Sequence, residues 1–502
     1  MKIETKNGSY YVYLPSKLYN KIVELAKDNK SIDLGLLAFL LHQILHRKFK
    51  DKNKANGSKW VSLCSCIIRQ FNFKDYIASK HLDFLIEQGV LKCLPHISGI
   101  VGKTNSCKKF RIVEEYFNDE NNSSKSFYEE YMFKNERIVS QYKKNITQRK
   151  AIAEYKTEHL TKWLNQSGFT MDKEKAVEYI NSKYSLKGDE PKKFKRQLAI
   201  RDFESSIDVY SRCGKDDRLH TYFTTLPSDL KQFVTCNRYT LKEADIKSSQ
   251  PFILSFILGV IQHEYNIEMN KYSSMSLRRF SNRLYRRFNS LINTYEEEEV
   301  GEYRLDIRSI CNSITIMLQE STKPIDFTEI NKFISLVQSG RVYEVVGEAL
   351  FKQGSISFKN NKYIVRLFDK DSNSRKWFEF ETLRKCAKKA TINALYGSPG
   401  NTSVDAIVQF KLLFPEIAKY LKAMKSNDKA DLPILLQRIE SKCILDHCSK
   451  KIAKKHPKML IITRHDSLVA IECDFELMKQ EFQSLLSEYF KIEVDLGEET
   501  WH

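Results

Sequence analysis

The sequence predicts an α+β protein that begins with a winged-helix-like domain. Stretches with the helical spacing of apolar residues are interrupted by short runs of apolar and β-branched residues, which are typical of strands. Within residues 1–118, two helical segments, SLCSCIIRQFN and DYIASKHLDFLIEQG, precede VLKCLPHISGIVGKTNSCKKFRIV, which has the pattern of a β-hairpin. Helix, helix and hairpin in this order describe a winged helix.

The second helix of such a domain enters a groove of DNA, and its hairpin contacts the backbone. Lys80 and His81 are the candidates on this helix, and Lys103 and Lys108 would lie on or near the wing. A winged helix can also serve protein contacts alone or act as a spacer. The wing lysines favour DNA over these alternatives.

Composition points to an acidic partner. The chain has 502 residues, with 82 Lys and Arg against 63 Asp and Glu, and a net charge of +19. A surface of this charge attracts polyanions, with nucleic acid as the leading partner. The apolar windows LGLLAFLLHQIL and PFILSFILGVI are too short to span a bilayer, and the first residues do not resemble a signal peptide, so we expect a cytoplasmic protein with no membrane partner.

The cysteines give no metal assignment. The 11 cysteines are scattered without the paired spacing of a zinc ribbon. Such a pattern more often indicates reduced cysteines in the hydrophobic core than a metal site.

A polar stretch, NDENNSSKS, marks a predicted linker after residue 118. Residues 119–214 have a helical pattern rich in Lys and Arg, which often indicates only a solvated face. The residues with recognisable chemistry lie in the third part, 215–502.

Two aspartates in this part each stand at the end of a predicted strand. Asp245 closes the short strand 241–246, before an apolar helix that starts near Pro251. Asp466 occupies a tight turn in ITRHDSLVAIE, between two strand-like runs. Aspartate is common in turns, so either residue alone has an ordinary explanation. Together, two such carboxylates could hold a pair of Mg²⁺ ions.

A basic helix is the third candidate feature. The segment ETLRKCAKKATINALYGSPG predicts a helix that ends at Gly397. Arg384 and Lys388 are four residues apart and share a face, where an anion such as a triphosphate would relieve their repulsion.

In this order the segments resemble the motifs of the DNA polymerase family A and single-subunit RNA polymerase superfamily. Motif A of that family is an aspartate after a strand, similar to Asp245 in ADIKSSQPFIL. Motif C is His-Asp on a hairpin, matched by His465 and Asp466.

Motif B of the family has Arg, three residues, Lys, seven residues and Tyr-Gly. Arg384, Lys388, Tyr396 and Gly397 match this spacing. Fainter similarities place Arg218, in DDRLHTYFTTLP, at a primer contact and Gln437, in LQRIESKCI, in the glutamine segment before motif C. The terminal IEVDLGEETWH is also similar to the family's ending, so the resemblance covers roughly residues 215–502.

The resemblance implies a right-hand polymerase with a palm, fingers and a thumb-like helical region. Asp245 and Asp466 would hold two Mg²⁺ ions, with Mn²⁺ as an alternative. Lys388 would bind the nucleoside triphosphate and protonate the leaving pyrophosphate, and Arg384 would clamp the phosphates. Tyr396 would lie beside the sugar, and His465 would contact the primer or template.

Departures from the family pattern concern three positions. Ser467 stands where many DNA polymerases of the family have Glu, and it matches the RNA-making branch. Gln250 replaces the Glu that blocks a ribose 2′-OH, and Tyr343 replaces a phosphate-binding His. A DxE exonuclease motif is not evident upstream, so proofreading is not expected.

Several functions fit these residues. The first is templated, primer-dependent DNA synthesis for a phage or mobile element, with the winged helix recruiting the enzyme to DNA. An RNA polymerase or primase on the same palm is the runner-up, and template-independent nucleotide addition is a third chemistry. A non-enzymatic alternative is a winged-helix replication protein whose polymerase-like half is only a scaffold.

Overall fold

The N-terminal part contains two small sheets, three described α-helices and a short 3₁₀ helix, Glu114–Phe117. The computed structural model describes residues 2–501 except 5–7, 28, 51–59, 64–67, 74–76, 95–106, 118–127, 167, 186–189, 207–208, 272–275, 293–304, 321–324, 370–373 and 399–404. One sheet has the order β1 (Lys2–Glu4), β2 (Ser9–Pro15), β6 (Tyr128–Lys134), and the other β3 (Val61–Ser62), β5 (Lys109–Ile112), β4 (Leu91–Leu94). The helices are α1 (Ser16–Lys27), α2 (Leu34–Lys50) and α4 (Ala78–Glu87).

Helix α4 and the β4/β5 hairpin lie where the winged-helix pattern expects the second helix and the wing. The side chain of Lys80 is exposed. His81 was expected to contact DNA, but this expectation was wrong, because only 1% of the residue is exposed. His81 belongs to the apolar stripe of α4, and its Nε2 accepts a hydrogen bond of 3.0 Å from the backbone N–H of Asp33.

Three helices follow the N-terminal sheets along the chain. These are α5 (Glu136–Asn165), α6 (Lys173–Lys183) and α7 (Glu190–Ser206). The first turns of α5 pack into the N-terminal core, which also includes Phe194 and Leu198 of α7. The last turns of α5, with Leu160 and Leu164, pack into the larger C-terminal core. The helix therefore bridges the two cores.

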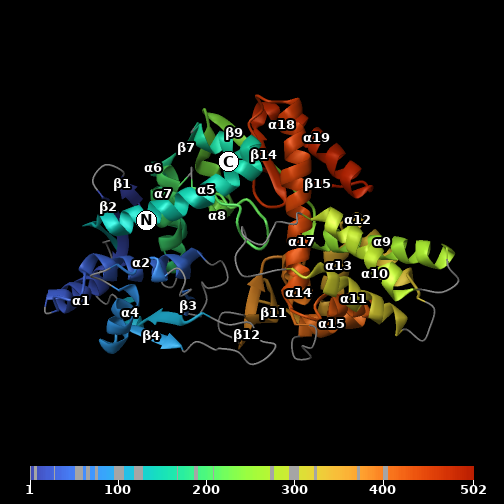
Figure 1. Ribbon diagram of the computed structural model, residues 1–502, viewed down its shortest axis with the longest axis horizontal. Coiled ribbons are helices and arrows are strands. Elements are labelled where there is room, and N and C mark those ends of the chain that lie inside the picture. Colours follow the sequence, from blue (N-terminus) through green and yellow to red (C-terminus); the bar gives the residue numbers. More distant parts are fainter. Residues whose placement is uncertain are drawn as a thin grey trace.

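The C-terminal core surrounds a six-stranded sheet. Its order is β13 (Ile462–Thr463), β14 (Ser467–Ile471), β9 (Tyr239–Ile246), β8 (Val234–Cys236), β7 (Phe169–Met171), and β15 (Leu496–Thr500) also pairs with β9. Helix α19 (Glu472–Phe490) packs against β9 and β14. In Figure 1 this sheet lies above the middle of the molecule, between the N-terminal helices and the yellow and orange helices.

A mainly helical region follows between β9 and β13. It contains α9 (Ser249–Lys271), α10 (Leu277–Leu291), α11 (Ile307–Gln319), α12 (Thr328–Gln338), α13 (Val342–Lys352), α14 (Leu383–Tyr396), α15 (Asp405–Leu413), α16 (Pro415–Met424), α17 (Asp431–Ser441), the π-helical segment Lys442–Cys448 and α18 (Ser449–Lys455). Between α13 and α14 lies a third three-stranded sheet of β10 (Ile356–Lys359), β11 (Lys362–Asp369) and β12 (Ser374–Phe380). Across the described residues, no helix is long and apolar enough to cross a membrane.

Candidate active site

The backbone of the central sheet brings Asp245 and Asp466 to neighbouring positions. Strands β9 and β14 are antiparallel, with Asp245 opposite Ser467. The backbone N–H of Ile246 donates to the carbonyl oxygen of Asp466 at 3.1 Å. The expected hairpin carries Asp466 in the turn between β13 and β14. Residues more than 200 positions apart in sequence are thus fixed side by side by main-chain hydrogen bonds.

Both carboxylates have a raised pKa. Burial raises the pKa of Asp245, and the negative charge of Glu243 raises it further, while Lys388 opposes the rise. Burial also raises the pKa of Asp466, and the charges of Glu440 and Asp245 add to this effect. Each shift reflects carboxylates that repel one another in a poorly hydrated place, and a nearby cation would relieve that repulsion.

The donor set fits a divalent metal that is completed by other ligands. Carboxylate oxygens are the ligands that Mg²⁺ and Mn²⁺ prefer, and Mg²⁺ is often held by one or two carboxylates with substrate phosphates. Among the described residues, no group of three or more His, Cys, Asp and Glu side chains could hold a metal ion. If such a cation binds here, Asp245 and Asp466 would supply two carboxylates, and water or a phosphate would fill the remaining positions.

A buried carboxylate, Glu243, holds the hairpin from the strand beside it. Its oxygens accept hydrogen bonds from Ser467 Oγ at 2.6 Å, Arg464 Nη1 at 2.9 Å, Lys231 Nζ at 2.6 Å and Trp501 Nε1 at 3.0 Å. Ser467 and Arg464 stand on either side of the His465–Asp466 turn. The turn is consequently anchored at both of its ends.

His465 adopts a left-handed backbone conformation, with a φ of +62°, at the tip of this hairpin. Its ring lies 5.8 Å from that of His220, edge to face. Non-glycine residues adopt this conformation uncommonly, so the turn is held by its surroundings.

A second buried carboxylate, Glu440, joins residues that the sequence had placed in separate roles. Glu440 lies on α17 with 1% exposure, and it accepts hydrogen bonds from Ser249 Oγ at 2.6 Å and from Gln250 Nε2 at 2.7 Å. The Arg218 guanidinium also donates to it and forms an ion pair. Gln250 Oε1 accepts a hydrogen bond of 2.7 Å from the Tyr396 hydroxyl. Both ends of the Gln250 amide are therefore occupied.

Glu440 is a site residue that the sequence analysis missed. It lies three residues after Gln437, in a helix segment where a glutamate would ordinarily face solvent. Gln437 itself interacts with Tyr396, whose pKa burial raises. The only signal available was this proximity to Gln437.

Helix α14 brings its basic residues to the same region. Its first turn is capped by Thr382, whose hydroxyl accepts from the N–H of Lys385. Lys388 is exposed and close enough to Asp245 to lower the pKa of that carboxyl. Arg384 forms an ion pair with Glu344, one helix away.

Tyr343 lies beside this arginine. The guanidinium of Arg384 sits 5.6 Å from the centroid of the Tyr343 ring, and burial raises the pKa of the tyrosine to about 12. Tyr343 can thus contact the basic end of α14 as a neutral group.

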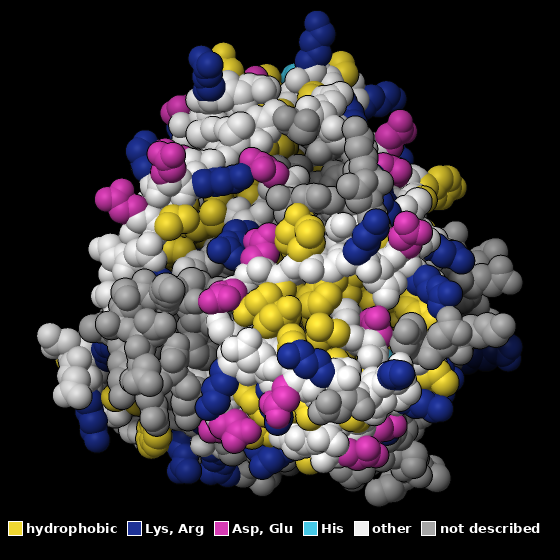
Figure 2. Space-filling view, turned by 90° about the vertical axis from the view of Figure 1, so that its left-hand side faces the viewer, with side chains coloured by type: hydrophobic (Ala, Val, Ile, Leu, Met, Phe, Trp, Pro, Cys, Tyr) yellow, Lys and Arg dark blue, Asp and Glu magenta, His cyan; other side chains and the backbone are white. Residues whose placement is uncertain are grey.

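The N-terminal candidates lie apart from these residues. Lys108 is exposed immediately before β5, and Lys80 is exposed on α4, whereas Lys103 lies outside the described residues. Figure 2 shows the side of the molecule that includes the N-terminal part, with Lys and Arg side chains spread around a hydrophobic area.

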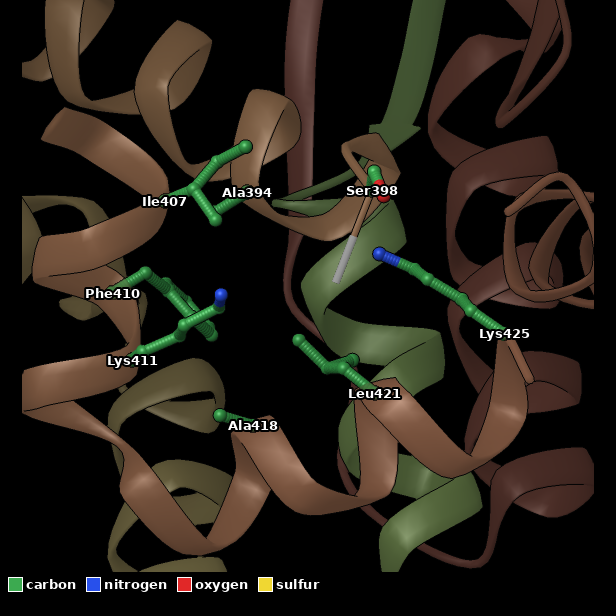
Figure 3. Close-up of a pocket in the computed structure, with 8 residues that line it drawn as sticks. All are labelled: Ala394, Ser398, Ile407, Phe410, Lys411, Ala418, Leu421 and Lys425. Carbon is green, nitrogen blue, oxygen red and sulfur yellow. The ribbon is translucent and has the colours of Figure 1, made fainter. Parts of the chain in front are cut away.

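A small pocket lies at the end of α14. It is lined by Ala394, Ser398, Ile407, Phe410, Lys411, Ala418, Leu421 and Lys425, which Figure 3 shows around a common space. Its volume of about 20 Å³ leaves room for roughly one water molecule. Such a volume is too small for a nucleotide. Lys425, one of the lining residues, donates a hydrogen bond of 2.9 Å to the carbonyl oxygen of Gly397 and so stabilises the end of α14.

Comparisons with known proteins add a remote structural likeness. No protein-family model matches the chain, and no curated protein matches it. A solved structure, the POL domain of Pol1 from M. smegmatis in complex with DNA primer-template and dNTP, is similar with 11% identity and a TM-score of 0.25. The match covers 65% of this chain and 55% of the other, so the chain spans little more than half the length of that structure. A likeness this low does not assign a family, an activity or a substrate.

Proposed function

We propose that the protein is a template-directed nucleotidyltransferase that adds nucleotides to a primer 3′ end. The observation that carries this proposal is the pairing of β9 with β14, which sets Asp245 and Asp466 at neighbouring backbone positions, with Lys388 close enough to Asp245 to lower the pKa of that carboxyl. Two fixed carboxylates and a neighbouring cation are what a two-metal phosphoryl transfer requires. The N-terminal domain, residues 1–118, would recruit the enzyme of a phage or mobile element to DNA.

Each residue has a chemical task in this proposal. Asp245 and Asp466 would hold two divalent cations, Mg²⁺ or Mn²⁺, and these would supply Lewis-acid activation of the 3′-hydroxyl and charge neutralisation at the triphosphate. Lys388 binds the triphosphate and donates a proton to the leaving pyrophosphate. Arg384 exchanges Glu344 for a phosphate as its partner, because a phosphate offers a bidentate, doubly charged acceptor.

The Gln250 amide supports a preference for deoxynucleotides. Its nitrogen donates to Glu440 and its oxygen accepts from Tyr396, so the orientation of the amide is fixed from both ends. We infer that the side chain excludes the 2′-hydroxyl by shape, without the charge of a carboxylate.

Ribonucleotide synthesis, by an RNA polymerase or primase, is the second candidate. The neutral side chains of Gln250 and Ser467 favour it, since neither carries the carboxylate expected of the DNA-making branch.

A primer-extension assay tests the proposal. The purified protein is given a primed DNA template and Mg²⁺ with either dNTPs or rNTPs, and we expect extension with dNTPs. Asp245→Asn and Asp466→Asn should each abolish extension, whereas Glu472→Gln, at the exposed first residue of α19, should leave it unchanged. Extension by both aspartate variants at the wild-type rate would refute the catalytic role, and efficient use of rNTPs alone would select the second candidate.

A further inference from the structure

The small sheet between α13 and α14 has one covered and one open face. Val365 and Leu367 of β11 are buried on the face toward the helices, and β11 and β12 contact α14. Side chains alternate along a strand, so the neighbouring positions point away from the core. There Arg366 is paired directly with Trp377 of β12, and both are exposed.

Trp377 is an unusual residue on this face. It is 62% exposed, and the guanidinium of Arg366 lies 5.8 Å from its ring centroid. An indole of this exposure keeps a large apolar surface in water, which costs free energy unless a partner covers it.

The charged residues of the open face indicate that its partner is negatively charged. Among the described side chains, four cations share the face, Lys359, Lys362, Arg366 and Arg375, against one carboxylate, Glu379. The face therefore offers a flat aromatic ring within a basic surface.

We propose that the open face of the β10–β11–β12 sheet binds single-stranded nucleic acid, with an unpaired base stacked on Trp377. Stacking needs an accessible base face, which a single strand offers and the interior of a duplex does not. The arginines and lysines pair with the phosphates on either side of the stacked base. The site uses neither carboxylate of the active site, so it extends the proposed function without depending on its chemistry.

Tryptophan fluorescence gives a direct test on the full-length protein. The chain has four tryptophans, of which Trp501 is 1% exposed, while Trp60 and Trp163 are partly buried. We expect a single-stranded DNA oligonucleotide to quench the emission of the wild type, and this quenching to be lost in Trp377→Phe. A labelled oligonucleotide followed by fluorescence anisotropy then measures affinity.

Trp377→Ala should weaken binding of the single strand roughly 5- to 150-fold, the effect of losing one stacked base. Trp377→Phe should retain part of the affinity, because a phenyl ring also stacks. Tyr155→Ala removes another exposed ring, 88% exposed on α5, and should leave binding unchanged. An RNA oligonucleotide of the same sequence serves as a second arm, and loss of binding in Trp377→Ala on either strand type supports the site.

The proposal would be overturned if Trp377→Ala bound both strand types with wild-type affinity. If this variant also changed its oligomeric state, the open face would be assigned to contact with a second copy of the chain. Asp466 lies outside the β10–β11–β12 sheet, so we expect Asp466→Asn to leave this sheet unchanged. Quenching without primer extension in that variant would separate this site from the proposed catalytic function.

Discussion

At the scale of single residues, Glu440 is a buried carboxylate that pairs with a largely buried cation of the candidate site. Its carboxylate is the ion partner of Arg218 and also accepts from Ser249 and Gln250. Glu440→Ala leaves the guanidinium without its partner in a largely buried place, and we expect a loss of about 3 to 5 kcal/mol in the free energy of unfolding. Urea unfolding followed by circular dichroism measures this change.

The matched control is a surface pair. Glu416 and Lys419 are separated by 2.7 Å on α16, and both side chains are exposed. Glu416→Gln should cost under about 0.5 kcal/mol. Equal losses in the two variants would mean that Glu440 contributes no more than a surface glutamate.

The Asp245 carboxylate occupies a space that is free because residue 497 is a glycine without a side chain. The two residues are paired across β15 and β9, and a Cβ at position 497 would lie 2.6 Å from Asp245 Oδ1. Gly497→Ala should therefore displace the carboxylate and reduce primer extension at least tenfold, since a shift of about 1 Å in a catalytic group can cost on the order of 100-fold in rate.

Gly259→Ala is the corresponding control. Gly259 lies within helix α9, and a Cβ added to it would meet its nearest neighbour, Ile334 Cδ1 of α12, at an ordinary distance of 3.9 Å. This variant should keep its activity and gain up to about 1 kcal/mol of stability from the better helix former. Full activity in Gly497→Ala would show that Asp245 tolerates displacement.

The two aspartates could be found from the sequence, whereas the buried glutamates could not. Asp245 and Asp466 interrupt apolar runs, which makes them visible at strand ends. Glu243 and Glu440 sit where local patterns predict exposure. Their burial depends on Lys231, Arg464 and Arg218 arriving from distant segments, and no local periodicity encodes those contacts.

At the scale of elements, the β13/β14 hairpin depends on Glu243. Ser467 donates to this carboxylate at 2.6 Å, so the position after Asp466 is already beside a negative charge. Ser467→Ala should cost about 1 kcal/mol by removing one hydrogen bond. Ser467→Glu should cost more, on the order of 3 kcal/mol, because it adds an unpaired carboxylate next to Glu243.

Thermal unfolding of the two variants checks this order. Ser335→Glu, on the exposed side of α12, introduces the same residue without burial and should be nearly neutral. A Ser467→Glu protein as stable as Ser467→Ala would contradict the assigned role of Glu243.

The contact between α5 and the π-helical segment should be sensitive to acid. His159 Nε2 lies 3.0 Å from the carbonyl oxygen of Leu445 and 3.0 Å from Ser449 Oγ, and burial lowers the pKa of this histidine to about 4. The unfolded chain has the ordinary value of about 6.5, so it binds more protons than the folded protein between these pH values. The contribution is thus complete above about pH 6.5 and is lost as the pH falls towards 4.

Urea midpoints at pH 7.5 and pH 5 measure this loss. His159→Gln should show a smaller difference between the two pH values than the wild type, whereas His263→Gln, exposed on α9, should show the wild-type difference. An unchanged pH dependence in His159→Gln would assign the acid sensitivity to other groups.

Elements with strong local signals were predicted better than those fixed by long-range pairing. Helix α14 ends at Gly397 as its sequence indicates, and α4 and the following hairpin lie where expected. The order of strands in the central sheet, by contrast, is set by pairing between segments far apart in the sequence. It joins β7, β8 and β9 to β13, β14 and β15, and only tertiary packing selects these partners.

At the scale of the whole molecule, basic residues occur in both halves while the hydrophobic interior is divided into two cores. The net charge of +19 alone would favour binding of any polyanion. DNA binding by a winged helix is a more specific hypothesis, since it requires particular lysines to contact phosphates. The salt dependence of binding distinguishes binding by net charge from binding by the winged helix.

The double variant Lys80→Ala/Lys108→Ala tests this claim with duplex DNA. Each lost phosphate contact lowers the slope of log K against log salt by about 0.9, so the double variant should reduce the slope by roughly 2 and weaken binding at low salt. Lys451→Ala/Lys455→Ala removes the same charge from α18, which Figure 1 places far from α4, and should leave the slope nearly unchanged. Equal slopes for the two double variants would mean that duplex DNA responds to net charge and that residues 1–118 make no specific contact.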